Sequence, residues 1–338
     1  MSNRNLVIVR AGDNSMHPLW LCTGGERNWD LLVSYEGDSP LRYPSAGEAM
    51  VRIDSKGPKW AVLNGLLRDT SDAWASYDYV WLPDDQLTSN CGDINRMFDL
   101  MAALDLRLAQ PSFSWESPGR APLTLHNPNF ALRYVNFVDP AAAVFSQAML
   151  RRAVPAMREC LHGSALRYVW PKFLENPARQ CAILDRVQVG TIGRGERPES
   201  LHLPAGSVTE AQETEHLLRK HGVQMAQPIV YGAMDSNGRL STLFDDRGDQ
   251  FIYKLCEGYL GCAESGPQAL GQIFTDHTRA RREYLRSTGL AGSAASSPEA
   301  GAGAAAPNGA VRVTAAAPTP APRPLQPARA GGGLVLKL

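Results

Sequence analysis

The chain has 338 residues, of which 44% are hydrophobic, and its 34 Lys and Arg balance its 34 Asp and Glu. A hydrophobic fraction of this size supports a sizeable folded core and excludes a wholly disordered protein. Because the net charge is zero, the field of the whole molecule attracts neither nucleic acid nor an anionic membrane, so we expect neither as a partner.

The amino-terminal sequence MSNRNLVIVR has too short an apolar stretch for a cleavable signal peptide. Nowhere does an apolar run approach the roughly 20 residues of a membrane-spanning helix. The six cysteines are scattered and form no CxxC pair, a pattern typical of reduced thiols buried as small hydrophobic groups. We therefore expect a cytoplasmic protein with no integral membrane segment.

The first hundred residues alternate between strand-like and helix-like patterns. Apolar runs predict strands at 5–9, 30–35 and 79–82. Residues 61–67 look helical, and residues 92–106 have the three- and four-residue spacing of an amphipathic helix, which Asp93 would cap. Alternating strands and helices of this kind predict an α/β fold with a mixed, mostly parallel sheet flanked by helices.

The alternation continues in the middle of the chain. Residues 132–139 and 179–190 have strand patterns. Between them we expect a helix that Ser146 caps and that extends to about residue 161, with a kink at Pro155. Gly163 would end this helix as a glycine C-cap.

Beyond residue 205 the pattern changes. We expect a charged helix at 206–221, strand-like pieces in VQMAQPIVYGAM and QFIYKLCEGYLG, and a helix at 268–290. The remaining residues are mostly Ala, Gly, Pro and Ser and would be disordered. The predicted organisation is an α/β domain over 1–205, a small carboxyl-terminal elaboration over 206–290 and a disordered tail over 291–338.

Two adjacent carboxylates, Asp84 and Asp85, follow the predicted strand at 79–82. Ligands of open α/β sheets bind beyond the carboxyl ends of the strands. Neighbouring carboxylates repel each other and favour a cation between them, and oxygen ligands suit magnesium or manganese that carries a nucleotide diphosphate. The alternative is a simple turn, in which Asp is common because its side chain bonds the local backbone.

Seven stretches carry a family resemblance: NLVIVRAGDNSMHPLWL, NWDLLVSYEGD, DSKGPKWAVLNGLL, YDYVWLPDDQL, QPSFSW, HNPNFALRYVNFVDPAAAVFS and HGSALRYVWPKF. Over about residues 5–200 they resemble a bacterial and plant family known only as a domain of unknown function. Some of its plant members carry the label lysine ketoglutarate reductase trans-splicing-related. That family looks like a remote relative of the GT-A glycosyltransferases, so the resemblance implies a GT-A-like (Rossmann-like) domain over 1–205.

The resemblance also implies a site. Asp84 and Asp85 match the first two residues of the family's Asp-Asp-Asp motif and would hold a divalent metal, Mn or Mg, with the diphosphate. The residues on the nucleotide-sugar side would be Arg10, Gly12, Asp13, Lys59 and Trp60, and those on the acceptor side Trp115, His162, Gly163 and Arg167. The residues alone leave alternatives open, because RAGDNS is equally typical of a turn that ends a strand and a Trp such as Trp60 is more often core.

Three departures from the family's pattern affect the chemistry. Gln86 replaces the third Asp, and an uncharged amide oxygen binds a hard cation more weakly. Arg167 stands where the family has an Asp, and a guanidinium cannot accept a proton. Gly190 and Thr191 stand where the family has a histidine. Loss of a general base alone commonly costs on the order of 10²–10⁴ in rate, so these departures favour a diverged copy.

The sequence therefore predicts a glycosyltransferase that uses a nucleotide sugar and a saccharide acceptor, with no catalytic residue assigned. A second hypothesis is a non-catalytic, glycosyltransferase-like protein that binds a sugar or a nucleotide. A third is an unrelated hydrolase that uses the same carboxylates. The chain has neither a phosphate-binding loop motif nor a GxGxxG that opens a helix, so ordinary ATPase and dehydrogenase functions lose support.

Overall fold

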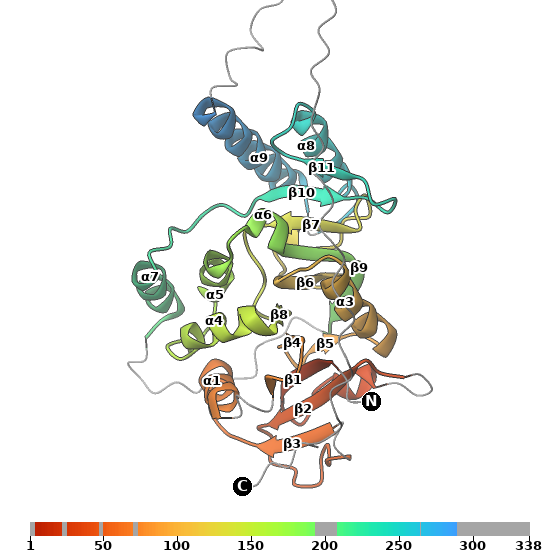
Figure 1. The fold of residues 1–338 in the computed structure, drawn as a ribbon, viewed down its shortest axis with the longest axis vertical. Helices are drawn as coiled ribbons and strands as arrows, with labels where there is room; N and C mark the ends of the chain where they lie inside the picture. The colour runs from red at the N-terminus through yellow and green to blue at the C-terminus, as the bar shows by residue number, and fades with distance from the viewer. Residues whose placement is uncertain are drawn as a thin grey trace, which may run out of the picture.

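The computed structural model describes residues 4–21, 26–46, 50–69, 74–192, 208–263 and 265–288. Within these residues the centre of the molecule is one mixed sheet of 11 strands. Its order is β11-β10-β7-β9-β6-β8-β4-β1-β2-β3, and β5 pairs with β9 outside this path. Figure 1 shows the sheet from β3 at the bottom of the view to β11 near the top. The tail predicted at 291–338 lies outside the described residues.

The strands are β1 (Asn5–Ala11), β2 (Trp29–Tyr35), β3 (Met50–Asp54), β4 (Tyr79–Trp81), β5 (Leu87–Thr88), β6 (Leu108–Phe113), β7 (Leu132–Val135), β8 (Val144–Ser146), β9 (Cys181–Thr191), β10 (Val230–Met234) and β11 (Leu240–Thr242). The α-helices are α1 (Lys59–Asp69), α3 (Cys91–Ala103), α4 (Gln147–Met157), α5 (Leu166–Val169), α6 (Pro177–Gln180), α7 (Glu210–Lys220), α8 (Gly248–Glu257) and α9 (Pro267–Ser287). The 3₁₀ helices are η1 (His17–Trp20), η2 (Pro122–Thr124) and η3 (Trp170–Phe173).

The amino-terminal half of the sheet is parallel. Strand β1 pairs in parallel with β2 on one side and with β4 on the other, and β3 pairs in parallel with β2. All seven residues of β1 are buried, as expected for a strand covered on both faces. Strand β8 then runs antiparallel between β4 and β6. The predicted fold class, a mixed and mostly parallel α/β sheet flanked by helices, is confirmed.

Helices cover this sheet and meet each other through aromatic side chains. In Figure 1, α1, α4, α5 and α7 lie together on the left of the sheet and α3 lies on the right. The rings of Trp60 and Trp170 meet edge to face at 5.6 Å, and Trp170 meets Phe145 of β8 at 4.9 Å. These contacts fix the start of α1 against the segment that follows α5.

The carboxyl-terminal segment is joined to the same sheet. Strand β10 pairs antiparallel with β7, and α8 and α9 lie at this end of the molecule (Figure 1). Beneath them Arg133 and Asp185 are fully buried and form two hydrogen bonds, at 2.7 and 2.8 Å. Arg133 also donates to the hydroxyl of Tyr259, which follows α8, so an ion pair buried between β7 and β9 holds the elaboration in place.

Two helix predictions are wrong in detail. The N-cap of α3 is Asn90, whose side chain accepts from the amide of Asp93, so Asp93 is not the cap. Helix α4 is capped by Ser146 as predicted, but it ends at Met157, so Gly163 does not cap it.

The segment QFIYKLCEGYLG forms α8 and its exit, not a strand. Its buried side chains Phe251, Ile252, Leu255 and Tyr259 recur at three- and four-residue intervals, which is the period of a helix. Strand β6 has no counterpart in the sequence prediction, because Pro111 interrupts its apolar run. The proline is tolerated because β8 pairs only with Leu108 and Ala109, and because the register with β9 shifts just after Pro111.

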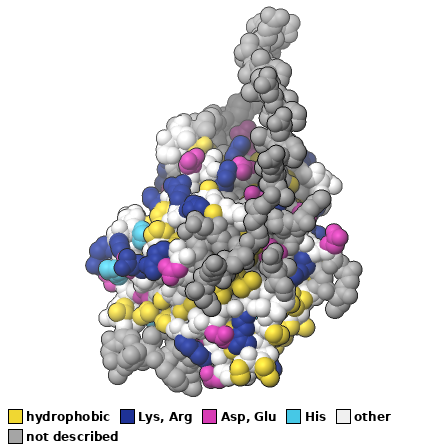
Figure 2. All heavy atoms as spheres, turned by 60° about the horizontal axis from the view of Figure 1, so that its bottom comes forward, with side chains coloured by type: hydrophobic (Ala, Val, Ile, Leu, Met, Phe, Trp, Pro, Cys, Tyr) yellow, Lys and Arg dark blue, Asp and Glu magenta, His cyan; other side chains and the backbone are white. Residues whose placement is uncertain are grey.

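None of the described helices is long and apolar enough to cross a membrane. Lys and Arg side chains gather at the left of the face in Figure 2, the side on which Figure 1 shows α7.

Cys91 is disulfide-bonded, which differs from the expectation of reduced thiols, whereas Cys160, Cys181, Cys256 and Cys262 are free.

Replacing Asp185 with Leu should lower the free energy of unfolding by about 3–5 kcal/mol, because it leaves the charge of Arg133 buried and unpaired. Adding Arg133→Met to this variant should cost less than the two single substitutions summed. Denaturant unfolding of the full chain measures both values. Arg282→Met, at an exposed position of α9, is the control. Additive effects of the two substitutions would contradict a coupled pair.

Candidate functional site

The two adjacent aspartates lie where the strand order of the sheet changes direction. From β1 the sheet extends to β2 and β3 on one side and to β4 on the other. Near the carboxyl end of β1, Arg10 forms a parallel bridge with Asp84, which follows β4, and the amide of Gly12 donates to the Asp85 carboxylate at 2.9 Å. The carboxyl ends of parallel strands at such a switch point form the usual ligand crevice of open α/β sheets.

Asp84 is half-exposed and has one charged partner. Its carboxylate contacts the ammonium group of Lys59, the first residue of α1. The Lys59 ammonium also lies 3.4 Å from the Leu82 carbonyl oxygen and 4.6 Å from the ring centroid of Trp60. A cation and a carboxylate therefore already meet at the end of β4.

Asp85 lies in a less polar environment than Asp84. Burial raises the pKa of the Asp85 carboxyl, and the charges of Asp84 and Glu36 act in the same direction. The Gly12 amide and the side chain of Gln86 oppose this shift. Gln86 presents its amide nitrogen to Asp85 at 3.4 Å, so in this geometry it acts as a donor. A nearby cation would favour the ionised form of Asp85, which burial disfavours.

The donor set fits a metal that arrives with its ligand. Among the described residues no group of three or more His, Cys, Asp and Glu could hold a metal ion. Magnesium, however, is often bound through one or two carboxylates together with substrate phosphates and waters. Asp84 and Asp85 supply such a pair, and they do not supply a closed site made of protein ligands alone.

Arg10 is buried within the scaffold. It donates to the Ser34 and Ser55 hydroxyls at 3.0 and 2.9 Å and to the Gly57 carbonyl oxygen at 2.7 Å, and it pairs with Glu36 at 3.0 Å. Burial lowers the pKa of its guanidinium. Arg10 thus ties β1 to β2 and to the segment before α1, which differs from the diphosphate contact expected of it.

Asp13 and Trp60 also have their side chains engaged. The Asp13 carboxylate accepts from the Tyr35 hydroxyl, and this bond lowers the pKa of Asp13. Trp60 is only 4% exposed, and a Cβ added at Gly163 would lie 1.9 Å from its indole nitrogen. The ring is therefore packed in the core and presents no open face to a nucleotide base.

A chain of contacts through Asp139 and Ala141 links Arg167 to Asp84. Arg167 and Arg120 lie 3.8 and 3.3 Å from the carboxylate of Asp139. Asp139 accepts from the amide of Ala141 at 2.9 Å, and the carbonyl of Ala141 accepts from the amide of Asp84 at 2.7 Å. Sequence reasoning missed Arg120 and Asp139, because nothing in their spacing links them to Arg167.

The loop before α5 is held by Glu213 of α7, another residue that sequence reasoning missed. Its carboxylate accepts from the amides of Leu161, His162 and Gly163 at 2.7 to 3.1 Å. The His162 ring bonds the Val208 carbonyl at 3.1 Å. Through these bonds His162 and Gly163 help to position α5. No signal in the sequence indicated that Glu213 would be their partner.

Further side chains lie on β6 and β9 or in the segment that follows β6. Gly190, at a position where the resembled family has a histidine, pairs with Thr88 of β5. Thr88 follows Gln86 by two residues, so the two strands bring Gly190 near Gln86. Trp115 donates to the carbonyl of His126 at 2.7 Å and supports the loop after β6. The His126 ring faces Asp185 at 3.8 Å, the Ser112 hydroxyl donates to the carbonyl of Val187 at 3.2 Å, and the hydroxyls of Ser114 and Ser117 lie 3.2 Å apart.

The loop after β1 is closed by a buried histidine. The ring of His17 bonds the Ser15 hydroxyl at 2.7 Å and meets the Tyr43 ring at 4.3 Å. The preceding amide, of Met16, donates to the Asp85 carbonyl at 2.7 Å. Burial lowers the pKa of His17 to about 4. Its neutral form is therefore part of the packing that supports the site.

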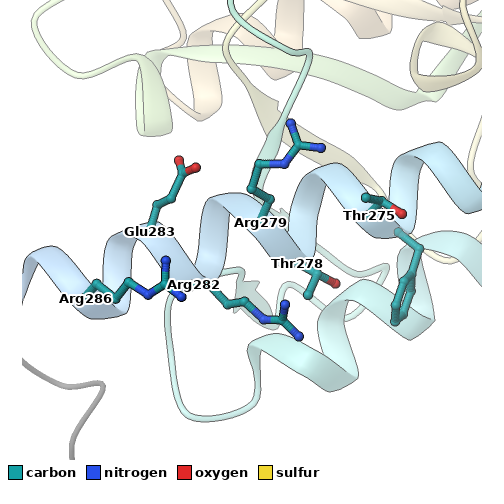
Figure 3. A pocket seen from close by; sticks show the side chains of 7 residues that line it. Thr275, Thr278, Arg279, Arg282, Glu283 and Arg286 are labelled. Carbon is teal, nitrogen blue, oxygen red and sulfur yellow. The ribbon is translucent and has the colours of Figure 1, made fainter.

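A pocket of about 360 Å³ lies elsewhere, on α9. Figure 3 shows Thr275, Thr278, Arg279, Arg282, Glu283 and Arg286 along this one helix. None of the predicted site residues lines it.

No protein-family model matches the chain, and no curated protein matches it either, so the family resemblance remains a prediction. Among solved structures, residues 1–349 of TarS from S. aureus, in complex with UDP-GlcNAc, match with a TM-score of 0.41 and 10% identity. The match covers 84% of this chain and 92% of that chain. A likeness at this level carries no argument about function, which has to come from the site itself.

Gly163→Ala should destabilise the protein by at least about 1–3 kcal/mol, the cost of a left-handed backbone for a non-glycine residue. Gly163 has a φ of +84°, and the new Cβ would also displace Trp60. Thermal unfolding measures the change. Gly271→Ala is the matched control, because Gly271 lies inside α9 with open space around its Cβ, and this variant should be neutral or slightly more stable. Equal stability of the two variants would contradict the packing of Trp60 on Gly163.

The free energy of unfolding should fall as the pH drops from about 6.5 to about 4. In this window the unfolded chain binds a proton at His17 and the folded chain does not, so stability is lost at about 1.4 kcal/mol per pH unit. The measurement compares how the free energy of unfolding depends on pH in the wild type and in His17→Gln. The contributions of the other titrating groups cancel in the difference. Identical slopes would show that His17 is not held neutral.

Proposed function

We propose that the chain is a nucleotide-sugar-dependent glycosyltransferase whose donor site is the edge between β1 and β4. One observation carries the proposal. Asp84, Asp85 and Lys59 meet at the carboxyl ends of the parallel strands, at the point where the strand order changes direction. A diphosphate needs positive charge and a metal needs carboxylates, and this edge offers both.

Each residue then has a defined part. Lys59 turns from Asp84 to an oxygen of the diphosphate, and its position at the start of α1 keeps it within reach of both. Asp84 and Asp85 would hold the cation, while the Gly12 amide holds Asp85 in place. A bound metal would neutralise the charge that develops on the leaving diphosphate. Arg10 positions the strand ends from within the core.

A second candidate is a non-catalytic protein that binds the same nucleotide sugar. It is favoured by the geometry of Gln86, which donates to Asp85, and by Arg167, which pairs with Asp139. Both candidates predict binding, and only the first predicts transfer of the sugar.

A panel of nucleotide sugars, with and without manganese, should contain a ligand that raises the thermal stability of the protein. At a hundredfold excess over the dissociation constant the gain is about 2.7 kcal/mol. The variant Asp84→Asn with Asp85→Asn should lose the manganese-dependent part of the shift. Asp246→Asn, at an exposed position near α8, is the control. An unchanged manganese-dependent shift in the double variant would contradict the site assignment.

A further inference from the structure

A second charged cluster consists of Arg120, Arg167 and Asp139, and it is linked to the proposed donor site through Ala141. It carries more positive than negative charge. Arg120 and Arg167 both face the single carboxylate of Asp139, at 3.3 and 3.8 Å. Asp139 is 7% exposed and also accepts from the amide of Ala141. Two guanidinium groups that share one carboxylate leave a surplus of one positive charge.

Both arginines have binding capacity that Asp139 does not use. Their side chains are 20% and 32% exposed, so solutes can reach them. The Nε of Arg167 is buried without a hydrogen-bond partner, and its terminal nitrogen lies too far from Asp139 for a hydrogen bond. A buried donor without an acceptor costs free energy. The guanidinium carbon of Arg120 lies over the ring of Phe113, 4.2 Å from the ring centroid, and this contact holds the side chain in position.

The carboxylates around this cluster are already engaged. Asp84 pairs with Lys59, Asp85 accepts from Gly12, and Asp139 faces the two arginines. Each of these three carboxylates therefore already has a hydrogen-bonding or charged partner. Asp139 is linked to Asp84 through the backbone of Ala141, which connects the arginine cluster to the proposed donor site.

We propose that the acceptor is an oxyanion, a carboxylate or a phosphate group, bound by Arg120 and Arg167. This inference rests on the proposed function. An oxygen of the acceptor forms a bond to the anomeric carbon of the nucleotide sugar. The bond from that carbon to the diphosphate oxygen breaks, and its electron pair leaves with the diphosphate. The acceptor is already ionised, so no proton is transferred and no general base is required.

The first test measures anion binding without turnover. Inorganic phosphate and acetate are titrated into the full-length protein at constant ionic strength, with chloride as the reference anion. The wild type should bind at least one of these two probes more tightly than chloride, and Arg120→Gln and Arg167→Gln should each weaken that binding at least tenfold. Arg167→Lys, which keeps the charge, should retain part of it. Arg68→Gln, at an exposed position of α1, is the control. Equal affinity in all variants would overturn the inference.

The second test measures transfer from the nucleotide sugar found by thermal shift. Acceptors with a carboxylate, with a phosphate and with hydroxyl groups only are compared. Hydroxylamine cleaves a glycosyl ester of a carboxylate but not a glycosyl phosphate, so the product identifies the source of the oxyanion. The rate should be independent of pH above the acceptor's pKa, and Arg167→Asp should lower it at least tenfold.

The outcomes separate this inference from the proposed function. Transfer to neutral hydroxyl acceptors, or a higher rate in Arg167→Asp, would overturn the oxyanion acceptor and leave the glycosyltransferase standing. Absence of binding by every nucleotide sugar would overturn the proposed function, and with it the transfer to an oxyanion.

Discussion

The common end of β1 and β4 is the constraint on which the site depends. Parallel pairing of the two strands brings Arg10 level with Asp84 and the Gly12 amide onto Asp85. Because β2 and β3 continue on the other side of β1, this edge lies where the order of the strands changes direction, the usual place for ligands in open α/β sheets. Everything else proposed here is arranged around this edge: Lys59 from α1, Asp139 from the connection before β8 and Arg167 from α5.

The surroundings of the edge explain why charged groups remain there. Arg10 is buried, yet five oxygen atoms of its neighbours surround the guanidinium, which offsets the cost of its burial. Glu213 holds the loop before α5 through backbone amides, so α5 presents Arg167 from a fixed position. The charges of the site therefore rest on a scaffold that is itself polar and held by many hydrogen bonds.

Local patterns predicted much of the fold and only part of the site. The strands at β1, β2 and β4 and the helices α1, α3 and α9 follow from apolar runs and helical spacing, which depend on neighbours in sequence. The pair Asp84 and Asp85 follows from its place after a strand. Arg120, Asp139 and Glu213 escaped prediction, because each acts through a partner that only tertiary folding brings near. For the same reason the sequence did not reveal that Arg10 has its contacts inside the scaffold, whereas the core position of Trp60 was one of the alternatives it left open.

The central claim is that Asp84 and Asp85 bind a divalent metal together with a nucleotide sugar. Electron paramagnetic resonance of manganese tests it directly, because bound ions lose the sharp signal of free ions. The account predicts little loss of signal with protein alone and a loss with protein and nucleotide sugar together that exceeds the loss with nucleotide sugar alone. A strong loss with protein alone, or no excess loss when both are present, would contradict it.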